Sequence, residues 1–82
     1  MDNLINEFGE IVRWPKKASD KEEVITYLAT KFDYENTYNE IEVNKIIYKY
    51  HLFEDIALLR RELVSRNFLS RRDDGSEYWR NN

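Results

Sequence analysis

The sequence predicts a mainly α-helical domain that ends in a β-hairpin, an α+β fold that is winged-helix-like, with three helices and a C-terminal two-stranded wing. Two observations predict it. Three amphipathic segments with helix-start signals follow one another between residues 19 and 66. Two short strand-like segments then flank Asp73-Asp74-Gly75-Ser76, where Asp-Gly is a strong hairpin signal. A chain of 82 residues holds one such domain with a modest core.

Residues 1–18 are predicted to form an N-terminal segment that is partly extended, and residues 19–82 the winged-helix-like domain. Pro15 favours extended geometry at Trp14 and stops any helix there. The apolar residues between positions 4 and 12 fit a helical stripe, but Gly9 weakens it. The sequence leaves the structure of this stretch open.

The first two helices are predicted from their N-terminal caps. Ser19 and Glu22 have the spacing of a capping box, which places the start of the first helix at Ser19. Asn39 and Glu42 have the same spacing, and the second helix is predicted to run from there to about Tyr50.

The third helix is predicted to begin after Asp55, its N-cap, and to continue to Arg66. Asn67 suits the left-handed position that often follows a helix. In the hairpin that follows, Arg71 is expected to pair with Tyr78 and Leu69 with Arg80. Phe68 and Trp79 are expected to close the core, which would leave Arg71, Tyr78 and Arg80 as an outward basic and aromatic strip.

Composition restricts the classes of function. The chain has no cysteine, so disulfides and thiolate metal sites are excluded. It has no apolar run of membrane-spanning length and an acidic N-terminus, so we expect a cytoplasmic protein with no membrane partner. The net charge of −3 combines −5 over residues 1–59 with +2 over residues 60–82. An anionic partner is therefore expected at the C-terminal end.

Catalysis and metal binding are not expected, and no cofactor is predicted. The single histidine, His51, lies near the end of the second helix, where an imidazole ring can meet exposed carbonyl groups. Glu40 and Glu42 lie about 200° apart on a helix and cannot converge on one ion. They are interpreted as charges that stabilise the helix N-terminus.

Arg60 is expected to be half-buried, because it falls about 60° from the centre of the buried face of the third helix. A guanidinium group in that position needs an acidic partner. The candidates for this structural ion pair are Glu40, Glu42 and Asp55.

Four separated blocks carry a family resemblance: Trp14-Pro15-Lys16-Lys17, Tyr38-x-Glu40-x-Glu42-Val43-Asn44, Leu59-Arg60-Arg61-x-Leu63-Val64 and Gly75-x-x-Tyr78-Trp79-Arg80. Over residues 14–80 the chain resembles a bacterial domain-of-unknown-function family, series number twenty eighty-seven. That family occurs alone and fused behind helix-turn-helix regulators, so the resemblance implies a transcription-linked role. It supplies no catalytic residues.

Two hypotheses of function follow. In the first, the domain is associated with transcription and binds nucleic acid, such as duplex DNA, through the wing and the third helix. The candidate contacts are Arg61, Arg71, Arg72, Tyr78 and Arg80, with Arg72 partly neutralised by Glu77. In the second, the domain is a non-catalytic interaction or effector module without DNA contact, and exposed Ile41, Tyr48 and Leu58 bind another protein or a second copy of the chain.

Overall fold

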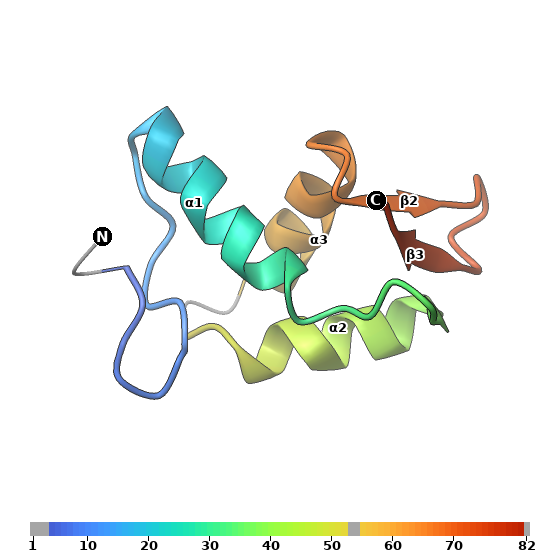
Figure 1. The fold of residues 1–82 in the computed structure, drawn as a ribbon, viewed down its shortest axis with the longest axis horizontal. Helices are drawn as coiled ribbons and strands as arrows, with labels where there is room; N and C mark the ends of the chain where they lie inside the picture. Colours follow the sequence, from blue (N-terminus) through green and yellow to red (C-terminus); the bar gives the residue numbers. More distant parts are fainter. Residues whose placement is uncertain (1–3, 53–54, 82) are drawn as a thin grey trace.

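Three helices and a small antiparallel sheet make up the part of the chain that this computed structural model describes, residues 4–52 and 55–81 (Figure 1). The elements follow in the order α1 (Ala18–Ala29), β1 (Thr37–Tyr38), α2 (Glu40–Lys49), α3 (Ile56–Ser65), β2 (Leu69–Arg71) and β3 (Tyr78–Arg80). This architecture confirms the predicted α+β class and is consistent with a winged helix.

The caps of α2 and α3 confirm their predicted starts. The Asn39 side chain accepts a hydrogen bond from the Glu42 N–H at 2.8 Å, and the Glu42 carboxylate accepts one from the Asn39 N–H at 2.8 Å. Asp55 caps α3 through the Leu58 N–H, at 3.1 Å. Beyond α3, Asn67 has a φ of 67°, the left-handed conformation expected of it.

The capping box predicted at Ser19 is wrong. Helix α1 begins one residue earlier, after Lys17, and no side chain caps it. Ser19 therefore lies inside the first turn. The Glu22 carboxylate instead reaches Arg66 at the end of α3, where an ion pair with a guanidinium is available to it.

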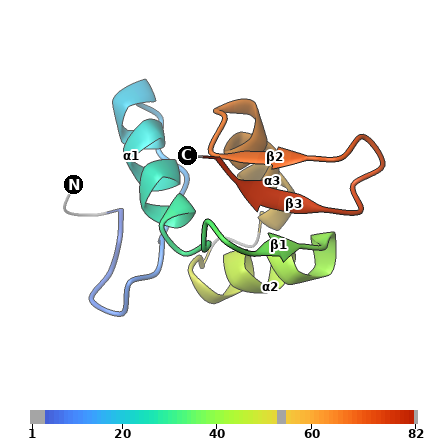
Figure 2. The ribbon, with the colours of Figure 1, turned by 45° about the vertical axis from the view of Figure 1, so that its right-hand side comes forward.

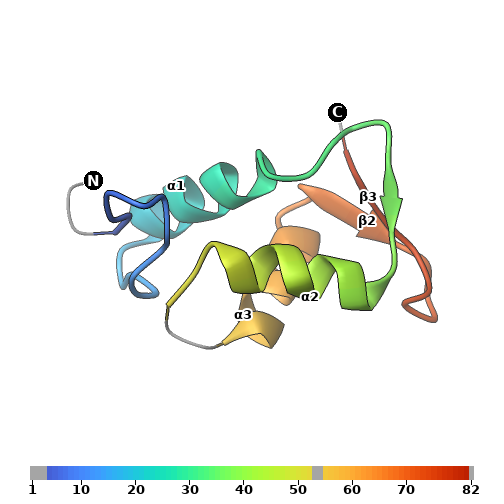
Figure 3. The same cartoon turned by 90° about the horizontal axis from the view of Figure 1, so that it is seen from below.

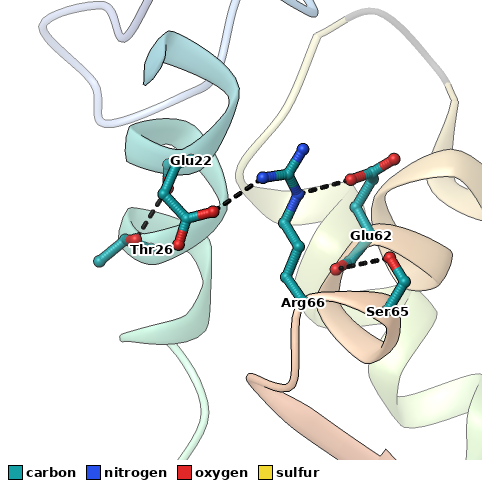
Figure 4. A network of polar contacts seen from close by, with 5 residues as sticks. All are labelled: Glu22, Thr26, Glu62, Ser65 and Arg66. Atoms are coloured by element: carbon teal, nitrogen blue, oxygen red, sulfur yellow. Dashed lines mark hydrogen bonds and ion pairs between the residues drawn. The ribbon is translucent and has the colours of Figure 1, made fainter. Parts of the chain in front are cut away.

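The Glu22–Arg66 contact is part of a network that joins α1 to α3 (Figure 4). Arg66 Nε lies 2.6 Å from Glu62 Oε1, and its Nη1 lies 2.7 Å from Glu22 Oε1. These hydrogen bonds, to Glu62 first and then to Glu22, raise the pKa of Arg66 above its usual value. The guanidinium thus stays charged and holds the two helices together.

The sheet has three strands rather than the predicted two. Strand β1 pairs with β3, with Thr37 opposite Trp79 and Tyr38 opposite Tyr78, so the order is β1-β3-β2 (Figure 2). A strand of two residues is too short to show an alternating pattern in the sequence. The pairing makes β3 the central strand.

The two strands of the hairpin pair in the predicted register, but the face that was expected to point to solvent meets the core. Arg71 pairs with Tyr78 and Leu69 with Arg80, as expected. Tyr78, however, is buried at 2% exposure, whereas Trp79 is exposed at 36%. The prediction that Tyr78 points outward and Trp79 closes the core is wrong, because the helices cover the face of the sheet that carries Leu69 and Tyr78.

The N-terminal segment packs into the same core as the helices. Ile11 is fully buried, and its backbone N–H donates to the Tyr50 carbonyl at 2.7 Å while its own carbonyl accepts from the Leu52 N–H at 2.9 Å. These bonds place the segment beside the C-terminal end of α2 (Figures 1 and 3). Between residues 4 and 12 the backbone forms turns and isolated bridges, not a helix.

The hydrophobic core is formed by residues of the N-terminal segment, all three helices, the loop after α1 and the hairpin: Leu4, Ile11, Val24, Ile25, Leu28, Ala29, Phe32, Val43, Ile47, Leu59, Leu63, Leu69 and Tyr78. Within the described ranges, no helix combines the length and the apolar character that a membrane span requires.

Candidate functional site

The outer face of α3 presents Arg61 and Ser65 to solvent, while Leu59 and Leu63 are buried on its inner face. This division follows from the helical spacing of the apolar residues. The Arg61 side chain makes no hydrogen bond or ion pair with any residue in the described parts of the chain. Its guanidinium is therefore available to a ligand.

Arg60 lies at the border between the two faces and is half-buried, as predicted. Its Nη1 donates to Asn44 Oδ1 at 2.5 Å, and its Nη2 lies 3.9 Å from Glu40 Oε2. Of the three predicted acidic partners, Glu40 is thus the one that the structure places at Arg60. Glu42 and Asp55 instead act as caps of α2 and α3.

The hairpin contributes the opposite wall through the paired residues Arg71 and Tyr78. The Tyr78 hydroxyl donates to Glu40 Oε1 at 3.2 Å, which connects the buried tyrosine to the start of α2. Arg71 is exposed, with its guanidinium carbon 5.9 Å from the centre of the Tyr78 ring. Its Nη2 donates to the Asp73 carbonyl at 3.1 Å.

These residues enclose a cleft of about 390 Å³ between α3 and the hairpin. We call it the α3–hairpin cleft. It is lined by Glu40, Arg60, Arg61, Val64, Ser65, Arg71 and Tyr78. Three arginines and one carboxylate give the lining an excess of positive charge, although the whole chain is acidic.

The turn of the hairpin bounds the cleft closely. Gly75 has a φ of +76°, and a Cβ at that position would lie 3.3 Å from Arg71 Nη2 and 3.5 Å from Glu40 Oε1. Asp74 accepts a hydrogen bond from the Ser76 N–H, which lowers the pKa of Asp74 and keeps its carboxylate charged. The turn of the hairpin therefore carries the acidic side chains of Asp73 and Asp74, and Arg71 lies directly beside it at the end of β2.

The other two wing arginines lie outside the cleft. Arg72 pairs with Glu77, with 2.6 Å between Nε and Oε1, and this hydrogen bond raises the pKa of Arg72. Its predicted partial neutralisation is thus confirmed.

Arg80 does not belong to an outward strip with Arg71, and that expectation is wrong. It is half-buried and donates from Nη1 to the Phe32 carbonyl at 3.1 Å. Its guanidinium carbon lies 4.0 Å from the centre of the Tyr34 ring. Arg80 thereby attaches the loop after α1 to strand β3, because the inner face of the hairpin is turned toward that loop.

A second surface lies on the outer side of α2. Ile41 and Tyr48 are 66% and 70% exposed, as predicted, and line a shallow groove of about 290 Å³. Asn44, Lys45 and Ile56 complete its lining. Leu58 does not line this groove and is only half-exposed, because it lies one-half turn further along α3 than Ile56.

His51 is buried, with Nδ1 2.8 Å from the Ile47 carbonyl oxygen, at the C-terminal end of α2. This is the position that the sequence indicated for it. Across residues 4–52 and 55–81, no three His, Asp or Glu side chains are grouped so that they could hold a metal ion.

Sequence reasoning singled out all three arginines of the cleft but not the cleft itself. It placed Arg61 and Arg71 in a nucleic-acid site and Arg60 with Glu40 in a structural pair, whereas the structure brings all four to one cavity. Val64 and Ser65 were not among the predicted site residues. The two sets are joined by the burial of Tyr78, which depends on the face of the hairpin that the helices cover.

The comparison with protein families identifies the chain. Residues 10–80 match the family model described as an uncharacterized protein conserved in bacteria, DUF2087. The match covers most of the chain, so the protein belongs to the DUF2087 family, as its four sequence blocks indicated. We find no significant match to it among curated proteins or among solved structures.

Proposed function

We propose that this DUF2087 domain is a non-catalytic, transcription-associated module that binds nucleic acid through its phosphate backbone, at the α3–hairpin cleft. The observation that carries the proposal is the convergence of Arg60, Arg61 and Arg71 on one cavity, with a single carboxylate among them. A winged-helix-like fold supports it by placing α3 and the wing on the same side of the molecule. Such a role would place the domain in the bacterial cytoplasm.

The proposal specifies contacts to phosphates and not to base edges. The exposed part of α3 offers Arg61 and Ser65, which is too few side chains to read a sequence in the major groove. Guanidinium groups match phosphate oxygens in geometry and charge. The acidic wing tip, with Asp73 and Asp74, would be repelled by the backbone. Contact is therefore expected on the side of the wing that faces the α3–hairpin cleft, through Arg71.

Nuclear magnetic resonance tests this proposal at the level of single residues. A short duplex DNA is added at low salt to the ¹⁵N-labelled domain, and shifts of the backbone and Arg Nε–Hε signals are mapped. The proposal expects the largest shifts at Arg61, Ser65 and Arg71, and little change at Arg13 in the N-terminal segment, which lies at the opposite end of the molecule from the hairpin (Figure 1). Shifts spread over the whole surface, or their absence, would contradict it.

The groove on α2 favours a second candidate function, an interaction module. Ile41 and Tyr48 are large, exposed side chains about two turns apart on one face of α2, and both line one groove that offers a partner an apolar surface. Lys45 lines the groove and Lys49 is exposed one turn further along α2. Charge complementarity therefore points to an amphipathic segment of another protein, with apolar side chains flanked by acidic ones.

A display library of peptides tests this second candidate. Peptides are selected on the wild-type domain and counter-selected on the Ile41→Glu variant, whose fold is first checked by circular dichroism. If the groove binds such a segment, we expect the selected peptides to be enriched in apolar residues at helical spacing with acidic residues beside them. Enrichment that does not depend on Ile41, or a consensus without acidic residues, would reject it.

A further inference from the structure

The α3–hairpin cleft already holds one anionic group of the chain itself, the carboxylate of Glu40. Its Oε1 accepts a hydrogen bond from the Tyr78 hydroxyl at 3.2 Å, and its Oε2 lies 3.9 Å from Arg60 Nη2. We propose that the cleft is a seat for a single phosphoryl group, and that Glu40 occupies this seat until a phosphate displaces it. The inference rests on the proposed function and deepens it, because it names the group bound and the residue that competes with it.

The contacts that hold Glu40 in the cleft are long, which makes its displacement possible. Both distances exceed those of strong charge-assisted hydrogen bonds, and the Glu40 side chain is 48% exposed. Arg60 does not depend on Glu40, since its shorter contact, 2.5 Å, is with Asn44. When the Glu40 side chain turns to solvent, Arg60 therefore keeps its position.

The donors around the seat fit a phosphoryl group better than a carboxylate. Arg61 and Arg71 can each present a planar pair of N–H donors, and the hydroxyls of Tyr78 and Ser65 line the same cavity. Inorganic phosphate or a phosphomonoester has at least three non-bridging oxygens that accept such bonds, and a phosphodiester has two besides its two ester oxygens, whereas a carboxylate has two oxygens in all. Within the described residues, neither Arg61 nor Arg71 is paired with a carboxylate, so both have charge to offer.

A charge-removing substitution at Glu40 distinguishes a competitor from a supporting residue. In Glu40→Gln the amide oxygen can still accept from the Tyr78 hydroxyl, but the negative charge is lost. If Glu40 competes with the ligand, this variant should bind phosphate about three- to ten-fold more tightly than wild type. If Glu40 supports the site, binding should weaken or stay unchanged.

The matched control is Glu42→Gln. It changes the net charge by the same amount, two residues away on α2 and about 200° around the helix. Its amide oxygen can still accept from the Asn39 N–H, so the capping box is retained. Both variants are first checked by thermal melts, which should show a similar small loss of stability for each, because both remove a negative charge from the first turn of α2.

The experiment has two arms, because a phosphoryl group can come from a nucleic-acid backbone or from a free phosphate compound. In the first arm inorganic phosphate is titrated into wild type, Glu40→Gln and Glu42→Gln, and the shift of the Arg61 and Arg71 Nε–Hε signals gives the affinity. In the second arm the same proteins are titrated with a short duplex that lacks terminal phosphates. The expected result is tighter binding by Glu40→Gln in both arms, with Glu42→Gln close to wild type.

The other outcomes separate the inference from the proposed function. Tighter phosphate binding by Glu40→Gln without duplex binding would support the seat, reject nucleic acid as the ligand and indicate a free phosphate or phosphomonoester. Duplex binding that is equal in the two variants would leave the proposed function in place and overturn the seat. Phosphate that shifts neither arginine in any of the three proteins would also overturn it.

Discussion

At the scale of single residues, the arginines of this domain divide by what surrounds their guanidinium groups. Arg66 lies between Glu62 and Glu22, and Arg80 lies on Tyr34. Both side chains connect elements that are distant in the sequence. Arg61 and Arg71 have no acidic partner among the described residues and line a cavity. The same residue type therefore stabilises the fold in one place and is available for binding in another.

Arg66→Ala should lower the free energy of unfolding by about 1 kcal/mol, because it removes the ion pair with Glu22 that joins α1 to α3 and the ion pair with Glu62 at the end of α3. Arg72→Ala is the matched control. It removes an ion pair of similar length at the exposed end of the hairpin and should leave the urea midpoint close to that of wild type. Urea unfolding of the two variants measures the difference, and equal midpoints would show that the α1–α3 connection adds nothing.

At the scale of elements, helix caps show which sequence signals decide local structure. The Asn39 and Glu42 pair and the Asp55 cap are present as the sequence predicts, because each capping residue stands directly before the first residue of its helix. The same spacing at Ser19 has no such effect. There the helix starts at Ala18, and Glu22 is drawn to Arg66, a partner that lies 44 residues further along the chain.

Asn39→Ala should therefore cost about 1 kcal/mol of stability, since it leaves the Glu42 N–H without its acceptor at the start of α2. Ser19→Ala should cost nothing and could add a few tenths of a kcal/mol, because alanine is the better helix former inside a turn. Thermal melts of the two variants test the difference. A loss at Ser19 as large as that at Asn39 would contradict the position of the α1 start.

The elements also show how far sequence reasoning reaches. Helix bounds and hairpin register follow from signals a few residues apart, and they were predicted closely. Which face of the hairpin meets the core was not, because Tyr78 and Trp79 are both aromatic and either one can close a core. The choice is made by the packing of the helices on the sheet, which brings together residues far apart in the sequence and gives no local signal at Tyr78 or Trp79. The error in the site, an outward Tyr78 and Arg80, follows from that choice of face.

At the scale of the whole molecule, the N-terminal segment is part of the folded unit. Ile11 is fully buried in the common core, and its backbone bonds to both sides of His51 join the segment to the end of α2. The family match begins at residue 10, just before this contact. The segment therefore contributes to the stability of the domain that carries the cleft.

Ile11→Ala should destabilise the fold by about 2–4 kcal/mol, the cost of a cavity in a packed core. Phe8→Ala, three residues away in the same segment, should change the stability by less than about 0.5 kcal/mol, because the ring is 75% exposed. Chemical denaturation measures both variants. A small effect at Ile11 would mean that the segment does not pack on the domain in solution.

The whole-molecule charge sets the conditions under which binding can be observed. With a net charge of −3, the domain is repelled by nucleic acid at long range, and attraction is confined to the cleft. Binding should then be weak and strongly dependent on salt. It should also depend on the two arginines that the structure leaves without acidic partners.

The most direct test of the central claim is the salt dependence of duplex DNA binding, measured by fluorescence anisotropy. Three proteins are compared: wild type, the double variant Arg61→Ala/Arg71→Ala, and the charge-matched double variant Arg13→Ala/Lys16→Ala as a control. Each phosphate contact contributes a slope of about 0.9 in log K against log salt. We expect the Arg61 and Arg71 variant to lose about 1.8 of the wild-type slope and the control to keep it. Equal slopes in all three proteins, or no binding by wild type at about 20 mM salt, where screening is weak, would contradict a phosphate-binding cleft.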